Sequence, residues 1–224
     1  MSKTKVLVRA IEFACITAIT YILAQADIND LWLILPIVIF LGMLICEYHV
    51  VSTERQLRVR EQLKLLIAFL HFEPEQIVRC TYHIPIRRFP KLHEKKLRQA
   101  FDYIPAGTGV GRLFPAEKGI IGEAYSMKRA LIANFRDDED FRQQMLSKYK
   151  YSEKELGLRR ADRRSYLCYS LVDEVNKVIG LIYFDSNKPE TFKSLTDLPQ
   201  IPDENDPLIK CILKGCETIK ETLL

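Results

Sequence analysis

The sequence lacks paired cysteines and any metal-ligand spacing. The six cysteines include no CxxC pair, and none stands at a ligand spacing from the four histidines; they are Cys15, Cys46, Cys80, Cys168, Cys211 and Cys216. No metal site is therefore predicted. Cys15 and Cys46 lie in apolar runs and Cys168 in a predicted strand, which favours buried, reduced thiols. The alternative is a thiol-redox site built on Cys80 and Cys168.

A strong charge and an obvious catalytic motif are also missing. The net charge of +4 gives no reason to expect a nucleic acid polymer as a partner. The three glycines between residues 105 and 111 suggest a phosphate loop, but no Lys-Ser or Lys-Thr follows them. They predict instead a turn into a strand at residues 110–114. No nucleophile–base pair or pair of acid–base carboxylates stands out, so we expect a protein that is not an enzyme and needs no cofactor.

Long apolar runs are present, but only in the first fifty residues. Residues 10–26 carry one charged residue, Glu12, and residues 31–46 carry none. About 20 apolar residues span a bilayer as a helix. Spans at about 10–26 and 31–49, joined by residues 27–30, therefore predict a transmembrane helical hairpin within residues 1–51. A signal peptide at the first run and a buried pair of soluble helices are the alternatives.

Basic residues around these runs predict an orientation. Lys3, Lys5 and Arg9 precede the first run, several arginines follow the second, and the connection carries only Asp27 and Asp30. The positive-inside rule then places both termini and the soluble domain in the cytoplasm, on the inner or plasma membrane. Free cysteines in the soluble part agree with a reducing compartment.

Residues 52–70 predict a linker helix with one apolar stripe. Val59, Leu63, Leu66 and Leu70 repeat at offsets of four, three and four. The helix either begins at a cap on Ser52 or Thr53 or continues from the preceding apolar run. Its stripe either packs on its own domain or forms a short parallel dimer seam, although two heptads are too few for a coiled coil.

The remaining residues, 71–224, predict an α+β domain. Two apolar runs at 165–172 and 178–185 read as paired strands, the second a central strand in which Gly180 marks a bulge or a close backbone approach. Further strands are predicted at 76–86 and 131–134. Helices are predicted at 91–103, which could run into a strand, and at 119–127, 137–149, 153–157 and 206–224.

The order of these elements resembles a GAF domain over residues 55–224. The resemblance depends on Gly119-Ile-Ile-Gly122, on the strand end at 179–186 and on the Thr191-Phe192 that follows. It implies a central antiparallel sheet with helices at its back and a small-molecule pocket on the other face. No cysteine suits bilin attachment, and the nucleotide-site pattern of phosphodiesterases is absent, so the family's ligands do not carry over. A GAF-like methionine sulfoxide reductase would need at least two pocket cysteines.

If the domain is a sensor, the loops beside the sheet supply the ligand-binding residues. Arginines suit phosphates or carboxylates, aromatic rings suit stacking, and Asn134 and Asp137 suit a donor–acceptor edge. The candidates are Arg112, Phe114, Asn134, Asp137, Arg160, Arg163, Arg164 and Tyr166. The alternative is that the arginines form a solvated loop or contact anionic lipid.

Two hypotheses for function follow. In the first, the GAF-like domain binds a small molecule, for which a cyclic nucleotide second messenger is the first candidate. The domain then controls the transmembrane hairpins, and the protein acts as an oligomeric pore-forming effector in bacterial defence signalling. In the second, the chain is a passive membrane-tethered binding or dimerisation module that recruits a separate signalling partner. Homo-oligomers are expected in both, because one two-helix hairpin cannot enclose a channel.

Overall fold

The computed structural model describes residues 28–70, 72, 76–87, 94–157, 162–193 and 202–224, and gives only the backbone for most of residues 28–49. The chain divides into two compact units, Met1–Gln56 and Leu57–Leu224. Each unit is described by itself.

One helix occupies the described part of the first unit and continues into the second. Helix α2 spans Ile28–Phe69, which is 42 residues. The second predicted span, residues 31–49, and the linker helix thus belong to one continuous helix without a cap between them. The first predicted span, residues 10–26, lies outside the described residues. Among the residues described in full, no helix is long and apolar enough to cross a membrane.

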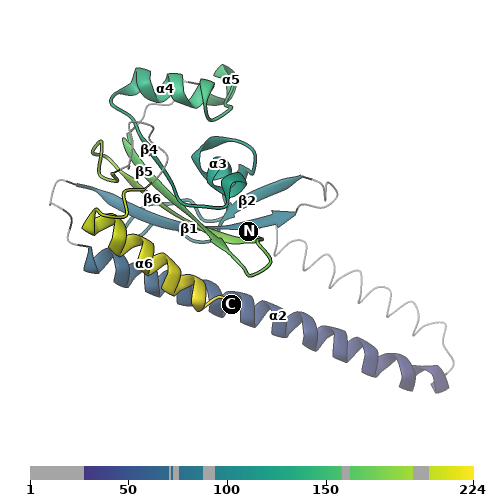
Figure 1. The fold of residues 1–224 in the computed structure, drawn as a ribbon. Coiled ribbons are helices and arrows are strands. Elements are labelled where there is room, and N and C mark those ends of the chain that lie inside the picture. Colours follow the sequence, from purple (N-terminus) through teal and green to yellow (C-terminus); the bar gives the residue numbers. More distant parts are fainter. Residues whose placement is uncertain (1–27, 71, 73–75, 88–93, 158–161, 194–201) are drawn as a thin grey trace. The chain divides into compact units, whose positions relative to one another are not determined.

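The second unit is built on a six-stranded, fully antiparallel sheet (Figure 1). Its spatial order is β3-β2-β1-β6-β5-β4, so β1 and β6 form the centre. The strands are β1 (Val78–Arg87), β2 (Lys95–Gln99), β3 (Leu113–Pro115), β4 (Leu131–Asn134), β5 (Ser165–Val172) and β6 (Val178–Ser186). This confirms the predicted pairing of residues 165–172 with 178–185 and the central position of the second strand.

Two predicted elements differ from the structure. Residues 95–99 form strand β2 rather than part of a helix over 91–103, because Leu97 and Gln99 are buried at alternate positions against β1. The charged residues around Leu97 imitate an amphipathic helix, and only the neighbouring strand decides between the two periods. Strand β3 begins at Leu113, not at 110, because Gly107, Gly109 and Gly111 keep the preceding loop at positive φ.

Different helices cover the two faces of the sheet. The end of α2, residues 57–69, and α6 (Pro207–Glu221) lie along one face (Figure 1). Helix α3 (Gly119–Met127) lies on the opposite face, and α4 (Asp138–Ser147) and α5 (Glu153–Leu156) follow β4. This α+β arrangement, a central antiparallel sheet with helices at its back, is the one that the resemblance to GAF domains predicts.

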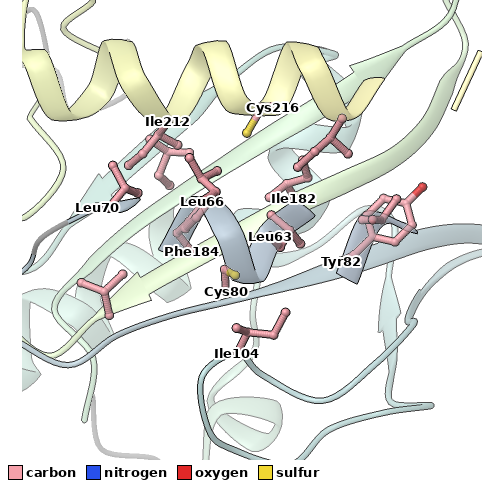
Figure 2. Close-up of a cluster of buried hydrophobic side chains, with 14 of the residues drawn as sticks. Leu63, Leu66, Leu70, Cys80, Tyr82, Ile104, Ile182, Phe184, Ile212 and Cys216 are labelled. Atoms are coloured by element: carbon pink, nitrogen blue, oxygen red, sulfur yellow. The ribbon is translucent and has the colours of Figure 1, made fainter. Parts of the chain in front are cut away.

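The core under α2 and α6 is built from apolar side chains. The predicted stripe on α2 is buried there, with Val59 and Leu63 fully inaccessible. It packs on its own domain and is therefore not available as a dimer seam. Figure 2 shows Leu63, Leu66 and Leu70 of α2 between α6 and the central strands, together with Cys80, Ile182, Phe184, Ile212 and Cys216.

Gly180 lies beside a bulge, as predicted, and it also makes room for a side chain rather than for another backbone. The pairing of β5 with β6 shifts register between Leu171 and Val172, so Ile179 is the extra residue of a bulge. The ring of Tyr82 on β1 lies over Gly180, and a Cβ there would collide with that ring. The missing side chain therefore makes room for an aromatic residue of the core.

We predict that Gly180→Ala destabilises the domain by about 1–3 kcal/mol, because the added methyl group overpacks against Tyr82. Urea denaturation measures this loss. The control is a double-mutant cycle with Tyr82→Leu, in which the cost of Gly180→Ala should shrink to less than half. An equal cost in both backgrounds would place the strain elsewhere.

Candidate functional site

The face of the sheet opposite α2 and α6 buries polar groups. Strand alternation sends Cys80 and Tyr82 of β1 toward the apolar core, and Arg79, Thr81 and His83 toward the other side. Along the same face lie buried side chains from the neighbouring strands, namely Gln99 of β2, Tyr166 of β5, and Tyr183 and Asp185 of β6. An apolar core needs none of these charges, so this face is the candidate functional site.

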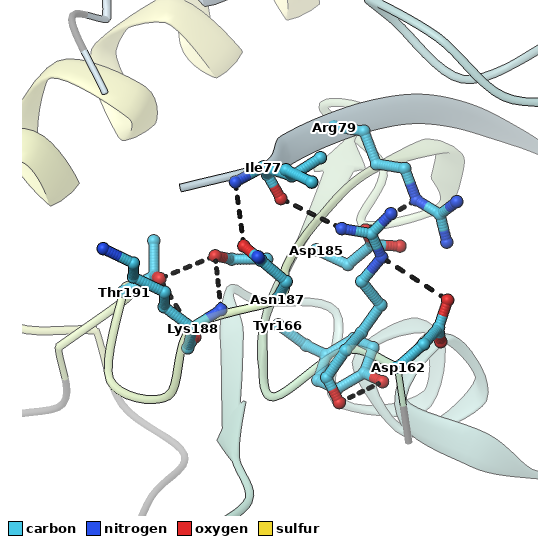
Figure 3. Close-up of polar contacts among 10 residues, drawn as sticks. Ile77, Arg79, Asp162, Tyr166, Asp185, Asn187, Lys188 and Thr191 are labelled. Atoms are coloured by element: carbon cyan, nitrogen blue, oxygen red, sulfur yellow. Dashed lines mark hydrogen bonds and ion pairs between the residues drawn. The ribbon is translucent and has the colours of Figure 1, made fainter. Parts of the chain in front are cut away.

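A buried carboxylate joins two arginines at one end of this face (Figure 3). Asp185 is 1% exposed and accepts a hydrogen bond of 2.7 Å from Arg79 Nε. Arg163 Nε lies 3.4 Å from the same carboxylate, and its Nη1 donates to the carbonyl of Ile77. The Arg79 guanidinium also lies over the ring of Tyr103, 4.1 Å from its centre. One carboxylate thus holds a cation from β1 and another from the segment that leads into β5.

Burial is the largest influence on the pKa values of Asp185 and Arg79. It raises the pKa of Asp185, and the hydrogen bond from Arg79 opposes that rise. Burial alone would lower the pKa of Arg79, but the bond from its guanidinium to Asp185 raises it overall. The carboxylate and Arg79 therefore hold each other in place on a face from which water is largely excluded.

A pair of uncharged polar side chains lies further along the sheet, one on β1 and one on β2. His83 and Gln99 are direct partners across β1 and β2, and both are fully inaccessible to solvent. The imidazole meets the ring of Phe114 edge-on at 5.1 Å and that of Tyr183 at 5.8 Å. Burial lowers the pKa of His83 to about 3, so the ring is neutral. Among the described residues, neither imidazole nitrogen nor Gln99 Oε1 has a hydrogen-bond partner.

The glycine-containing loop between β2 and β3 closes over this pair. Asp102 Oδ1 accepts hydrogen bonds from the backbone N–H groups of Gly109 and Val110, which lowers the pKa of Asp102. Gly111 N–H donates to the carbonyl of Gln99. A Cβ on Gly109 would lie 2.5 Å from the Gln99 amide atoms, so the loop backbone rests directly on that side chain. The loop thus covers a buried amide, and Gly109 is the residue that makes the close approach.

The structure distributes the predicted site residues over three settings. Arg163, Tyr166 and Phe114 belong to the polar face, where the Tyr166 hydroxyl donates to the Arg163 carbonyl. Arg112 is exposed at the end of the glycine loop. Arg160 lies outside the described residues.

The other three predicted residues have partners within the domain. Asn134 Nδ2 donates to the carbonyl of Phe192, and its Oδ1 accepts from Ser165. Asp137 caps the N-terminus of α4 by accepting from Asp140 N–H. Arg164 forms a 2.8 Å ion pair with Asp138. Each of these contacts orders a loop at the edge of the sheet, and their role in ligand binding stays a prediction.

Sequence reasoning missed Arg79, His83, Gln99 and Asp185. A signal was present for the two residues of β1, because they alternate with Cys80 and Tyr82 in a predicted strand. Asp185 ends the apolar run of β6, a position at which a carboxylate is easily read as the start of a turn. Gln99 was hidden by the helical interpretation of residues 91–103. The missed side chains share one face only because β1 lies between β2 and β6.

The two cysteines considered for a thiol-redox site lie in different cores. Cys80 belongs to the cluster under α2 and α6, and Cys168 to the cluster on the α3 side of the sheet. Burial raises the pKa of both thiols well above the ordinary range. A buried protonated thiol is a poor nucleophile, and these two thiols are separated by the sheet.

Comparisons with known proteins reach only the fold level. No protein-family model matches the sequence, and no curated protein matches it. Among solved structures, the chain is similar to the GAF domain region of a protein from Geobacter sulfurreducens PCA, with 13% identity, a TM-score of 0.47, and coverage of 77% of this chain and 97% of that one.

Two further similar structures come from a kinase and a reductase. The GAF domain of a two-component sensor histidine kinase from Bacillus halodurans is 17% identical, with a TM-score of 0.40 and coverage of 74% and 97%. The type II free methionine-R-sulfoxide reductase from Thermoplasma acidophilum is 14% identical, with a TM-score of 0.44 and coverage of 75% and 96%. At these identities and TM-scores, the likenesses carry no argument about ligand or activity.

We predict that His83 makes the domain acid-sensitive. Its folded pKa of about 3 lies below the ordinary value near 6.5, so the unfolded chain takes up a proton first as the pH falls. The stability contributed by the neutral ring is present above pH 6.5 and is lost at roughly 1.4 kcal/mol per pH unit below it. Urea denaturation should therefore show a loss of about 2 kcal/mol from this group between pH 7.5 and pH 5.

His83→Gln supplies the control for this pH dependence, since the amide does not titrate. The variant should lose less stability than the wild type over the same pH interval by about that amount. Parallel pH profiles for the two proteins would contradict a buried neutral imidazole.

Proposed function

We propose that this chain is a membrane-anchored sensor whose GAF-like domain binds a small molecule on the polar face of its sheet. The observation that carries the proposal is the contrast between the two faces of one sheet. The side under α2 and α6 is closed by apolar side chains, whereas the α3 side, beside an apolar cluster of its own, buries His83, Gln99 and Asp185 and holds the partly exposed Arg79.

The energetics of burial support this assignment. A buried polar group without a partner costs about 1–3 kcal/mol, and native proteins keep few of them. His83 and Gln99 together present three such atoms in adjacent strands. Leucine or phenylalanine at these positions would remove that cost, so a polar pair there has its best explanation in a bound molecule that completes its hydrogen bonds.

Membrane anchoring is proposed from the sequence of the first fifty residues. Residues 31–46 carry no charge, residues 10–26 carry only Glu12, and basic residues flank both runs. We place both termini and the sensor domain on the cytoplasmic side. Because α2 is one continuous helix from Ile28 to Phe69, a change at its buried stripe in the domain has a direct route toward the apolar segment.

The sensor proposal predicts that a small molecule stays bound to the full chain purified in mild detergent. Native mass spectrometry compares the intact mass with that of the denatured chain, and the released compound is then identified. Asp185→Asn should reduce occupancy by at least about tenfold, because Arg79 and Arg163 lose the carboxylate that positions them. Glu61→Gln, at a solvent-exposed ion pair, is the matched control and should leave occupancy unchanged. A chain that neither retains a small molecule nor is stabilised by any member of a metabolite collection would contradict the sensor function.

The output of the sensor is proposed to run through the membrane segment of an oligomer. Liposomes that carry the full chain and an encapsulated dye test this directly. Added cyclic nucleotides, or the compound found by mass spectrometry, should release dye from these liposomes and not from empty ones. Ligand binding without leakage would instead favour the passive module that recruits a separate signalling partner.

A further inference from the structure

The pair formed by His83 and Gln99 indicates which hydrogen-bonding groups a ligand would need, in more detail than the rest of the polar face does. As direct partners in an antiparallel ladder, the two side chains start about 5 Å apart and leave the sheet on the same side. Both are fully buried, and three of their polar atoms have no partner among the described residues. Two charged groups of the same face, Arg79 and Asp185, are paired with each other.

The hydrogen-bonding capacity of the pair can be counted. Gln99 Nε2 donates to the carbonyl of Phe101 at 3.0 Å, which leaves Oε1 as an unpaired acceptor. A neutral imidazole adds one donor and one acceptor. A partner molecule that offers an N–H to Gln99 Oε1 and, beside it, an acceptor to the imidazole N–H satisfies two of these three atoms.

The surroundings of the pair restrict the shape and charge of that molecule. Phe114 and Tyr183 bring aromatic rings within 6 Å of the imidazole, which suits a flat, apolar body. Burial is the cause of the low pKa of His83, with no contribution from a charged neighbour among the described residues, so an ionic group placed here would lose its hydration without compensation. A flat uncharged ring fits both conditions.

We infer that His83 and Gln99 form the floor of a subsite for an uncharged planar heterocycle with a cyclic amide, in which an N–H stands beside a C=O. This inference rests on the proposed sensor function and names the chemistry that the sensor reads. The ligand N–H donates to Gln99 Oε1, and the His83 N–H donates to the ligand carbonyl. The aromatic rings of Phe114 and Tyr183 border the heterocycle.

The glycine loop provides the cover of this subsite. Its backbone rests on the Gln99 amide at Gly109 and is held there by one carboxylate oxygen of Asp102. Access to the pair therefore requires the loop to rise from Gln99, a movement that releases two backbone hydrogen bonds. The outer residues of the loop, from Pro105 to Thr108, are exposed and do not oppose that movement.

The test compares probes that differ only at the amide edge. Guanosine and uridine carry an N–H beside a C=O, and 1-methylguanosine and 3-methyluridine carry a methyl group in place of that hydrogen. Calorimetry on the full chain in detergent should show that at least one parent nucleoside binds and that its methylated form binds at least about tenfold more weakly. Because this comparison uses the unaltered protein, it does not depend on the folding of any variant.

Substitutions then test whether His83 and Gln99 are the residues that recognise the amide edge of the ligand. Gln99→Met removes the acceptor at similar size and should weaken the parent nucleoside about tenfold while leaving the methylated probe unchanged. Gln143→Met, on the exposed side of α4, is the matched control. In the wild-type chain, the ¹⁵N resonances of the His83 ring should shift on binding, because one ring nitrogen gains a hydrogen bond.

The outcomes separate this inference from the sensor function. No binding of either parent nucleoside, or equal binding of parent and methylated forms, overturns the subsite. A copurified molecule whose occupancy Gln99→Met leaves unchanged also overturns it, and the sensor function stands. A buried water bound to His83 and Gln99 in a crystal structure, with neither nucleoside bound, overturns the subsite as well.

Discussion

The pairing of β1 with β6 at the centre of the sheet is the constraint on which the rest of the second unit depends. Six residue pairs, from Val78 opposite Ser186 to His83 opposite Leu181, fix the register. A shift of one residue would turn every side chain of one strand to the other face. Arg79 and Asp185 would then no longer share a side, and Cys80 would leave the apolar core. Register thus decides at once where the core is and where the polar groups meet.

This register produces two faces with different physical characters. Under α2 and α6, apolar side chains pack closely, and Gly180 and Gly215 lack side chains where Tyr82 and Leu66 need room. On the α3 side, one buried carboxylate pairs with two guanidinium groups beside a second apolar cluster. Both faces bury apolar surface. The α3 face also carries the cost of buried polar groups, and it is there that we propose a ligand binds.

The helix that covers the apolar face also connects the two units of the chain. Its buried stripe packs against the sheet, while its earlier residues form the apolar segment that we propose to lie in a membrane. In the proposed sensor, a molecule bound on the polar face contacts the sheet that the stripe covers from behind. We propose that α2 carries the output, because rigid, close-packed interiors transmit small displacements.

Much of the architecture could be read from the sequence because it depends on local patterns. Alternation and turn residues identified β5, β6 and most helices, and the spacing of Val59, Leu63, Leu66 and Leu70 identified the buried stripe of α2. These signals can be read without knowing which elements become neighbours. The sequence could not decide whether the stripe forms a dimer seam or covers the sheet, since both arrangements bury the same residues.

The candidate site depended on tertiary structure. Arginines near residue 163 and the aromatic residues Phe114 and Tyr166 could be named from their loops and strands, but the partners that give them a role come from β1, β2 and β6. His83 and Gln99 are 16 positions apart in sequence and become neighbours only through the β1–β2 ladder. The sequence by itself determined most of the elements and which helix face is apolar, because propensity and periodicity are local, whereas β2 required its neighbouring strand. Only the tertiary structure decided which polar side chains share a face, because strand order and register are set by the packing of the whole domain.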